Sequence, residues 1–312
     1  MGSPHLTSRF ALITTLFAAG CTGVIDLGET AGVPALPSPS APERAFVPAP
    51  LQMKRLQAYQ YRGAIADLLG EAAAAKAAPP PDTALAGFDA IGASQLALST
   101  SDIQAYEKSA LAVAEAAFAD VVRRRELVGC APANAEDGAC MSRFIARFGR
   151  RAFRRTLDDE EVARWRQVGV GAGKAYGDFH KGAAYAVAGM LQSPHFLYLV
   201  ASGTPEGDRL RLTGQELAAR LAFYLTGSIP SDALLIAGET GELDTREGLE
   251  RHARELMQHP GARRALTAFF DELLKLRELD ELPKSTAEFP AWTPALRTSM
   301  RQETLLLLED IV

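Results

Sequence analysis

Thr213-Gly-Gln-Glu216 opens, and Gly227 closes, the stretch TGQELAARLAFYLTG, which carries the signals of a helix with defined ends. The threonine and the glutamate three residues later form a capping box, in which each side chain bonds the other residue's backbone N–H group. A glycine at the far end readily takes the left-handed conformation that ends many helices. The stretch therefore predicts one helix, and similar stretches recur along most of the chain.

The same helical signals continue on both sides of this stretch. Ser99 has Asp102 three positions later as its capping partner, and further N-cap signals are Ser231, Asp244 or Thr245, and Thr293 with Pro294 at the first helical position. Apolar residues recur at three- and four-residue spacing. The predicted helices are one ending at Gly70, a turn at 72–75, a long helix from Ser99, and helices near 139–153, 158–170, 177–192, 232–237, 246–258, 261–278 and 294–312.

These elements predict an all-α fold: a multi-helix globular body, either as one unit or as two packed helical subdomains. The three predicted helical modules are 53–127, 128–200 and 201–312. Residues 82–98, which follow three consecutive prolines, predict a loop, and His195–Val200 reads as a strand or a buried turn. The long helix from Ser99 should pack closely through a narrow, alanine-rich face formed by Ala105, Leu111, Ala112, Ala116, Ala119 and Val122.

The N-terminus has the pattern of a secretory signal peptide over residues 1–20. Arg9 precedes the apolar run Phe10–Ala19, which is followed by Gly20 and Cys21. A basic start, a short apolar core and small residues before the cleavage point define such signals, and this run is too short to span a bilayer. The ending resembles a bacterial lipoprotein signal, in which Cys21 carries the lipid, such as palmitate. Cleavage to a soluble secreted form is the alternative.

The bulk composition limits what the protein binds. The chain has 312 residues and a net charge of −5, which becomes −6 without Arg9. This mild acidity argues against nucleic acid as a partner, because such binding depends on neutralising phosphates. Residues 21–52 are rich in Gly, Pro, Ser and Ala, which predicts a disordered tether. Thr22, in place of the Asp that retains lipoproteins at the inner membrane, favours an outer-membrane destination, on the periplasmic side or at the cell surface, by the same resemblance.

Two cysteines remain when Cys21 is assigned to the lipid. Cys130 and Cys140 flank a turn-rich stretch, and disulfides persist in an oxidising compartment. We therefore expect a disulfide between them. A metal site is the rival interpretation, but no nearby His or third Cys completes one.

No recognisable catalytic motif is present, so whether the protein is an enzyme stays open, and neither a cofactor nor a metal is expected. The haem attachment motif, the zinc-protease motif and glycine-rich phosphate loops are absent. His252 and His259 are seven residues apart, but His259 abuts Pro260, where a cationic histidine at a helix end is favoured over a metal ligand. His195, near Tyr198 at a helix exit, is either a structural histidine or a polar group aimed at a pocket.

The most pronounced charge feature is an arginine-rich helix. Arg143, Arg147, Arg150 and Arg154 are expected on one helix face, opposite Phe144, Ile145, Phe148 and Ala152. This face is a candidate interface for an anionic polymer or lipid headgroups. Pairing with the acidic turn 158–161, which follows Thr156, and with other surface carboxylates is the favoured alternative.

Acidic and aromatic residues allow a weaker hypothesis of polysaccharide binding or hydrolysis. Glycoside hydrolysis uses two carboxylic acids flanking a bond, and Trp165 and Trp292 are residues of the type that stacks on sugars. The acids are predicted at helix starts or on solvent faces, and core packing is the default for both tryptophans.

Several segments in order resemble one group of proteins. They are similar to successive modules of the planctomycete-type multidomain envelope proteins of unknown function, which often occur with c-type cytochrome modules. The segments are 55–70, 88–89, 148–162, 193–198, 216–224 and 282–284. The resemblance implies an extracytoplasmic helical protein, with a redox system beside a c-type cytochrome as an alternative role, and it supplies no catalytic residue.

The sequence as a whole predicts an exported lipoprotein that acts as an accessory or binding component of the cell envelope. Its expected partners are the membrane, through the lipid on Cys21, and an envelope protein or polymer. The C-terminal run Leu305–Leu308 lies in an apolar helix without a stop signal. We expect this helix either to dock on the body or to belong to a shortened domain.

Overall fold

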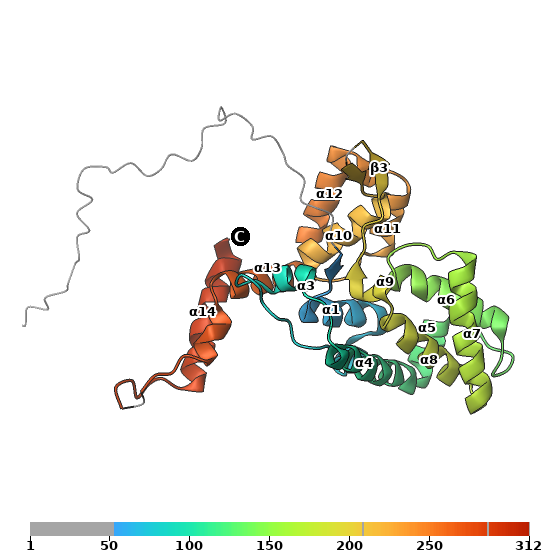
Figure 1. Ribbon diagram of the computed structural model, residues 1–312, viewed down its shortest axis with the longest axis horizontal. Coiled ribbons are helices and arrows are strands. Elements are labelled where there is room, and N and C mark those ends of the chain that lie inside the picture. The colour runs from blue at the N-terminus through green and yellow to red at the C-terminus, as the bar shows by residue number, and fades with distance from the viewer. Residues whose placement is uncertain (1–52, 208, 286, 312) are drawn as a thin grey trace, which may run out of the picture. The chain divides into compact units, whose positions relative to one another are not determined.

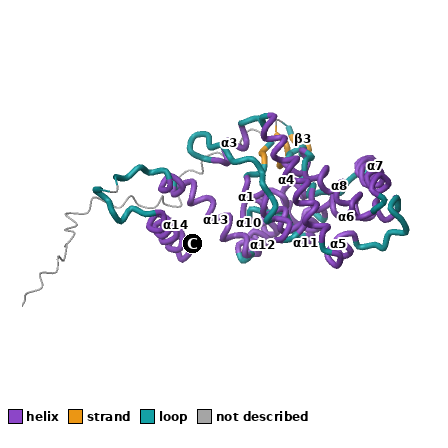
Figure 2. The backbone as a smooth tube through the Cα atoms, turned by 90° about the horizontal axis from the view of Figure 1, so that it is seen from below, coloured by secondary structure: helices purple, strands orange, loops and turns teal. Residues whose placement is uncertain are grey.

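The computed structural model describes residues 53–207, 209–285 and 287–311, and helices make up most of them (Figure 1). The all-α class is confirmed, because the strands among these residues are only two or three residues long (Figure 2). The predicted signal peptide, the tether and the lipidation residue Cys21 lie outside the described residues.

The first group of elements follows the predicted pattern closely at its start. It comprises β1 (Lys54–Arg55), α1 (Ala58–Leu69), α2 (Glu71–Ala74), α3 (Asp89–Gln95), α4 (Thr100–Ala119) and α5 (Val121–Val128). Gly70 ends α1 with a φ of 84°, and Ser99 forms the predicted capping box with Asp102. The alanine run forms the predicted helical turn, α2.

Two predictions in this group are wrong. The segment 82–98 is not only loop, because Asp89–Gln95 forms α3. The buried face of α4 is not the predicted one: Leu111 is 41% exposed and Val122, beyond the helix, 65%. The residues that α4 buries are Tyr106, Ser109, Ala110, Val113, Ala114, Ala117 and Phe118.

The second group contains the three helices expected after the cysteine loop. They are α6 (Gly138–Ala152), α7 (Asp159–Tyr176) and α8 (Phe179–Leu191), and they lie together in Figure 1. Asp158 caps α7 and forms a capping box with Glu161. The run after Ser193 is a helical turn, α9 (Pro194–Leu197), followed by β2 (Tyr198–Leu199), which pairs antiparallel with β1.

The third group begins with a hairpin that the sequence did not predict. Its strands are β3 (Thr204–Glu206) and β4 (Arg209–Arg211). The remaining elements are α10 (Gly214–Thr226), α11 (Asp232–Glu239), η1 (Glu242–Asp244), α12 (Arg246–Met257), α13 (Pro260–Leu273), η2 (Leu276–Asp280) and α14 (Pro294–Ile311). The capping box of Thr213 and Glu216 and the left-handed Gly227 are confirmed, and Ser231 and Thr245 cap α11 and α12.

The buried apolar residues form two clusters that share α10. Ala219 and Phe223 on α10 join the larger cluster, which is built mainly from α1, α4, α6 and α8. Ala218 and Ala222, on the adjacent face, join the smaller cluster with residues of α11 and η1. Each pair is spaced by four residues, so α10 presents one apolar stripe to each cluster.

The C-terminal helix contacts α13 through ion pairs, but none of its residues is buried, and Leu306 and Leu307 are 57% and 60% exposed. The expected docking of its apolar run on the body is therefore not confirmed. Arg301 on α14 donates to both carboxylate oxygens of Asp271 on α13, at 2.7 and 2.9 Å, and Glu309 pairs with Arg263. Among the described helices, we find none that combines the length and apolar character needed to span a membrane.

Candidate functional site

The arginine-rich helix is mostly engaged in bonds to the protein itself. Arg150 donates to Glu239 at 3.0 Å and to Asp232 at 3.1 Å, and Arg147 donates to the carbonyl oxygen of Leu127. Arg155 forms a two-pronged pair with Glu161, with both distances 2.7 Å. The interpretation that the predicted face pairs with surface carboxylates is confirmed for Arg150. The acidic turn is instead paired with Arg155, which is not part of that face. Arg143 stays exposed.

Arg154 does not lie on the predicted helix face. The helix ends at Ala152, and Arg154 takes a left-handed backbone conformation with a φ of 59° that turns its side chain into the interior. Its guanidinium donates to the carbonyl oxygens of Ala152, His195, Phe196 and Tyr198, and lies 5.5 Å from the ring centre of Phe223. Burial lowers the pKa of Arg154 to about 9, which leaves it charged at neutral pH. Arg154 therefore acts as a structural cross-link.

His195 and Tyr198 meet Arg154 through their backbone carbonyls, not through their side chains. The ring of His195 packs 5.5 Å from that of Phe153, and its Nε2 lies 3.8 Å from Glu161. Burial and the neighbouring Arg155 lower the pKa of His195. Neither His195 nor Tyr198 lines the cavities described below. The structure thus brings the candidate residues Arg154, His195 and Tyr198 together. They meet through backbone hydrogen bonds between packed segments and do not form a cavity.

Two other histidines show how the sequence pattern misleads. Pro260 starts α13 instead of ending a helix, and His259 is the N-cap, with its Nδ1 accepting from the Gly261 N–H group at 3.0 Å. The predicted role of His259, a contact with the terminal carbonyls of a helix, is therefore wrong, because its side chain bonds an N–H group at the start of α13. His252 bonds Glu255 through Nδ1 at 3.0 Å.

The two tryptophans have different surroundings. Trp165 packs against the main core and forms an edge contact with Phe153, with ring centres 6.3 Å apart, so the predicted core role is confirmed. Trp292 donates to the Leu282 carbonyl oxygen, and Lys284 and Arg297 lie near its ring.

One candidate site is a cavity of about 550 Å³ between α4, α5, α7 and α8, which we call the α4–α8 pocket. Its volume falls in the range of small-molecule sites. Its apolar wall consists of Leu111, Ala114, Phe118, Ala119, Ala184 and Ala188. Its polar lining consists of Glu115, Arg124, Tyr176, Asp178, His180, Lys181 and Tyr185.

Two polar atoms of this pocket lack hydrogen-bond partners among the described residues. They are Arg124 Nε and His180 Nδ1, and both are buried. Burial, with the nearby Arg124, lowers the pKa of His180, so its ring is neutral at pH 7. Buried polar atoms are nearly always bonded, so each of these two atoms needs a partner from outside the described residues, such as an ordered water or a ligand.

Sequence reasoning did not single out this pocket. Tyr176 ends α7 and Tyr185 lies within α8, so no single-helix periodicity connects them. Their rings stack with centres 5.3 Å apart, and their hydroxyl oxygens are 2.7 Å apart. The turn at Gly177, where the chain reverses with a φ of 62°, brings them together.

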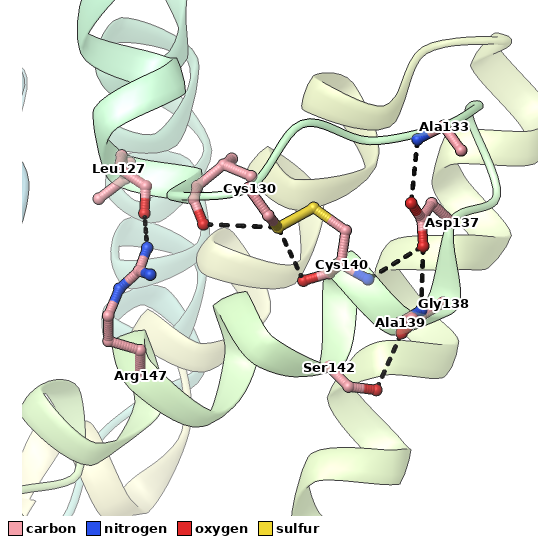
Figure 3. Close-up of a disulfide and its surroundings, with 10 residues drawn as sticks. Leu127, Cys130, Ala133, Asp137, Gly138, Ala139, Cys140, Ser142 and Arg147 are labelled. Atoms are coloured by element: carbon pink, nitrogen blue, oxygen red, sulfur yellow. Dashed lines mark hydrogen bonds between the residues drawn. A yellow bond between two sulfur atoms is a disulfide. The ribbon is translucent and has the colours of Figure 1, made fainter.

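The disulfide joins the segment that follows α5 to α6. Cys130 and Cys140 are bonded as predicted (Figure 3). Asp137 caps α6 by accepting from the N–H groups of Ala139 and Cys140, and it also accepts from Ala133 within the loop. The bridge therefore ties the chain just after α5, the helix that carries Arg124, to the start of α6.

A smaller cavity, of about 340 Å³, gathers residues from all three predicted modules. It is lined by Asp67 on α1, Arg151 on α6, and His252 and Glu255 on α12, among others. Asp67 accepts from Ser228, and His252 already lies between the carboxylates of Glu255 and Glu242. Arg151 Nε and His252 Nε2 in this cavity also lack hydrogen-bond partners among the described residues. The α4–α8 pocket is the stronger candidate because it is larger and carries a stacked tyrosine pair.

Three protein-family models match the chain in succession. Protein of unknown function (DUF1587) matches residues 54–119, Protein of unknown function (DUF1595) matches 140–200, and Protein of unknown function (DUF1592) matches 212–312. No curated protein and no solved structure matches the chain.

This succession defines a class of helical multidomain proteins. The chain belongs to the planctomycete-type multidomain proteins, which are built from successive domains of unknown function. The resemblance in the ordered motifs is thereby confirmed. The α4–α8 pocket combines α4, in the first matched region, with α8, in the second, while Arg124 comes from the segment between them.

Proposed function

We propose that this protein is an exported lipoprotein, anchored through Cys21 at the outer membrane, that serves the cell envelope as a binding component. The tether 21–52 would hold the helical body away from the membrane surface. The partner is an envelope polymer or protein, and the α4–α8 pocket is the place on the body where we expect it to bind.

The observation that supports export most strongly is the Cys130–Cys140 disulfide. Disulfides persist outside the cytosol and are rare within it, where thiols are kept reduced. The loop that this bond closes is also held by the Asp137 carboxylate, which accepts hydrogen bonds from the N–H groups of Ala133 and Cys140. A disulfide of this kind fits an oxidising compartment.

The α4–α8 pocket supports a binding role over a purely structural one. It unites an apolar wall, a pair of stacked tyrosines and two buried polar atoms without partners. A few placed polar groups in an otherwise apolar cavity are characteristic of ligand sites.

Cell fractionation with a labelled fatty acid tests the proposal. We expect the full-length chain to carry the label and to sediment with outer membranes. Replacing the lipidation residue (Cys21→Ser) should abolish the label and change the fractionation, whereas Cys130→Ser with Cys140→Ser should keep the label. An unlabelled wild-type chain in the cytosolic fraction would refute the proposal.

The same purified protein distinguishes this role from the redox alternative. A binding component should show no visible absorbance of its own and no reversible redox transition. A chromophore or bound metal that copurifies in stoichiometric amount with the full-length chain would favour a redox role instead.

A further inference from the structure

We propose that the α4–α8 pocket binds a neutral saccharide unit. This inference rests on the proposed binding function and gives it a ligand class. It depends on three independent features of the pocket: its charge balance, its unbonded polar atoms and its aromatic pair.

The charge balance favours a neutral ligand. The charged groups of the lining are Arg124 and Lys181 on one side and Glu115 and Asp178 on the other. Asp178 is already engaged at the start of α8, where Oδ1 accepts from the N–H groups of His180 and Lys181. A pocket with equal numbers of cations and anions gives no net attraction to a phosphate or a polycation.

The unbonded atoms favour a ligand rich in hydroxyl groups. Arg124 Nε can only donate a hydrogen bond, whereas a neutral His180 Nδ1 either donates or accepts, according to its tautomer. A hydroxyl group both donates and accepts, so neighbouring hydroxyls on one ring can satisfy either arrangement. A purely apolar ligand would leave both atoms unbonded.

The outer face of Tyr185 in the tyrosine pair supplies a flat surface of the kind that packs on a sugar ring. Tyr176 is 52% exposed and Tyr185 is 41% exposed, although their rings stack on each other with an interplanar angle of 15°. Lys181 lies over the Tyr176 ring, at 5.3 Å from its centre. An amphipathic ring with one apolar end and one polar end is well suited to a ligand that has C–H faces and hydroxyl edges.

Titration calorimetry with the mature full chain tests this assignment. The probes are cellohexaose, maltohexaose and chitohexaose as neutral oligosaccharides, and hexagalacturonate as a charged one. We expect at least one neutral probe to bind and the charged probe to bind more weakly. Tyr185→Ala should lower the affinity about tenfold, and Arg124→Gln should lower it as well.

A matched control separates loss of the site from loss of folding. Tyr224 on α10 is 81% exposed and lies outside the α4–α8 pocket, so Tyr224→Ala should leave the affinity unchanged. All variants should keep the wild-type helical circular dichroism. The assignment is overturned if no neutral probe binds at millimolar concentration, if only hexagalacturonate binds, or if Tyr185→Ala and Arg124→Gln bind like the wild type. In each case the fractionation result is unaffected, so the envelope proposal is judged separately.

Discussion

Arg154 places a positive charge in the interior with carbonyl oxygens, rather than a carboxylate, as its bonded partners. Burying a charge is costly unless the charged group is hydrogen-bonded, and the two terminal nitrogens of Arg154 donate to four backbone acceptors. These acceptors come from the end of α6 and from the α9–β2 segment, and Phe223 brings in α10. One side chain therefore ties the second and third groups of helices together.

Removing this guanidinium should destabilise the fold strongly. Arg154→Met leaves several buried carbonyls without donors, so we expect the free energy of unfolding in urea to fall by about 3 kcal/mol or more. The exposed Arg143 on α6 is the control, because Arg143→Met should change stability by less than about 0.5 kcal/mol. Equal effects of the two substitutions would contradict the role of Arg154.

Glu161 should contribute stability that depends on pH. Its bonds to Arg155 lower its pKa in the folded state. A carboxyl group whose folded pKa is lowered stabilises the protein above its unfolded pKa, about 4.3, and loses this effect as the pH falls through the folded value. Wild type should therefore exceed Glu161→Gln in stability at pH 7, and the difference should shrink below about pH 4. A difference that grows in acid would contradict this assignment.

At the scale of elements, the sequence predicts helices well where their ends are encoded locally. The capping boxes at Ser99 and Thr213 and the glycine ends at Gly70 and Gly227 all appear as expected. These signals involve residues at most four positions apart, so they can be recognised in the sequence without knowledge of the tertiary structure.

The elements that the sequence predicted wrongly depend on contacts between residues far apart in the chain. The start of α3 depends on α13 and η2: the Asp89 N–H group donates to Glu272, and its carboxylate accepts from Arg277, nearly two hundred residues away. On α4, alanines lie on both faces of the helix, so the alanine pattern does not show which face is buried. The buried face is the one that carries Tyr106 and Phe118. The α4–α8 pocket was missed for the same reason, because its lining is spread over four helices.

The packing of α7 against α8 depends on glycine. A Cβ at Gly182 would lie 2.3 Å from the Gly169 carbonyl oxygen, whereas a Cβ at Gly171 has nothing within 4 Å. We expect Gly182→Ala to lower the unfolding free energy by about 1–3 kcal/mol through overpacking. Gly171→Ala should instead raise it by about 0.5–1 kcal/mol, since alanine favours helix. Thermal or urea unfolding of both variants checks the sign of each change.

Loss of the disulfide should loosen α5 most. Closing the loop between Cys130 and Cys140 is worth about 3 kcal/mol in the chain-entropy account. The double variant Cys130→Ser, Cys140→Ser should lose a comparable unfolding free energy. Relative to the wild type, its amide exchange should speed up more in α5 than in α13. Reductant should destabilise the wild type but leave the double variant unchanged. A wild type insensitive to reductant would mean that the bridge adds no stability.

At the scale of the whole molecule, sequence reasoning reached the fold class and the family but not the candidate site. Helical periodicity and the order of the motifs are properties of the chain itself, and both predictions are confirmed. A pocket is a property of packed surfaces, so its residues become visible only when α4, α5, α7 and α8 are placed together.

The central claim is that the protein works outside the cytosol with Cys21 lipidated and its other two cysteines bonded. Thiol trapping in intact cells tests this most directly, because the chain has three cysteines in all. A mass-shifting alkylating reagent should add nothing to the mature protein under denaturing conditions, and after reduction it should add two labels, at Cys130 and Cys140. An unprocessed chain that takes up three labels without reduction would contradict the account.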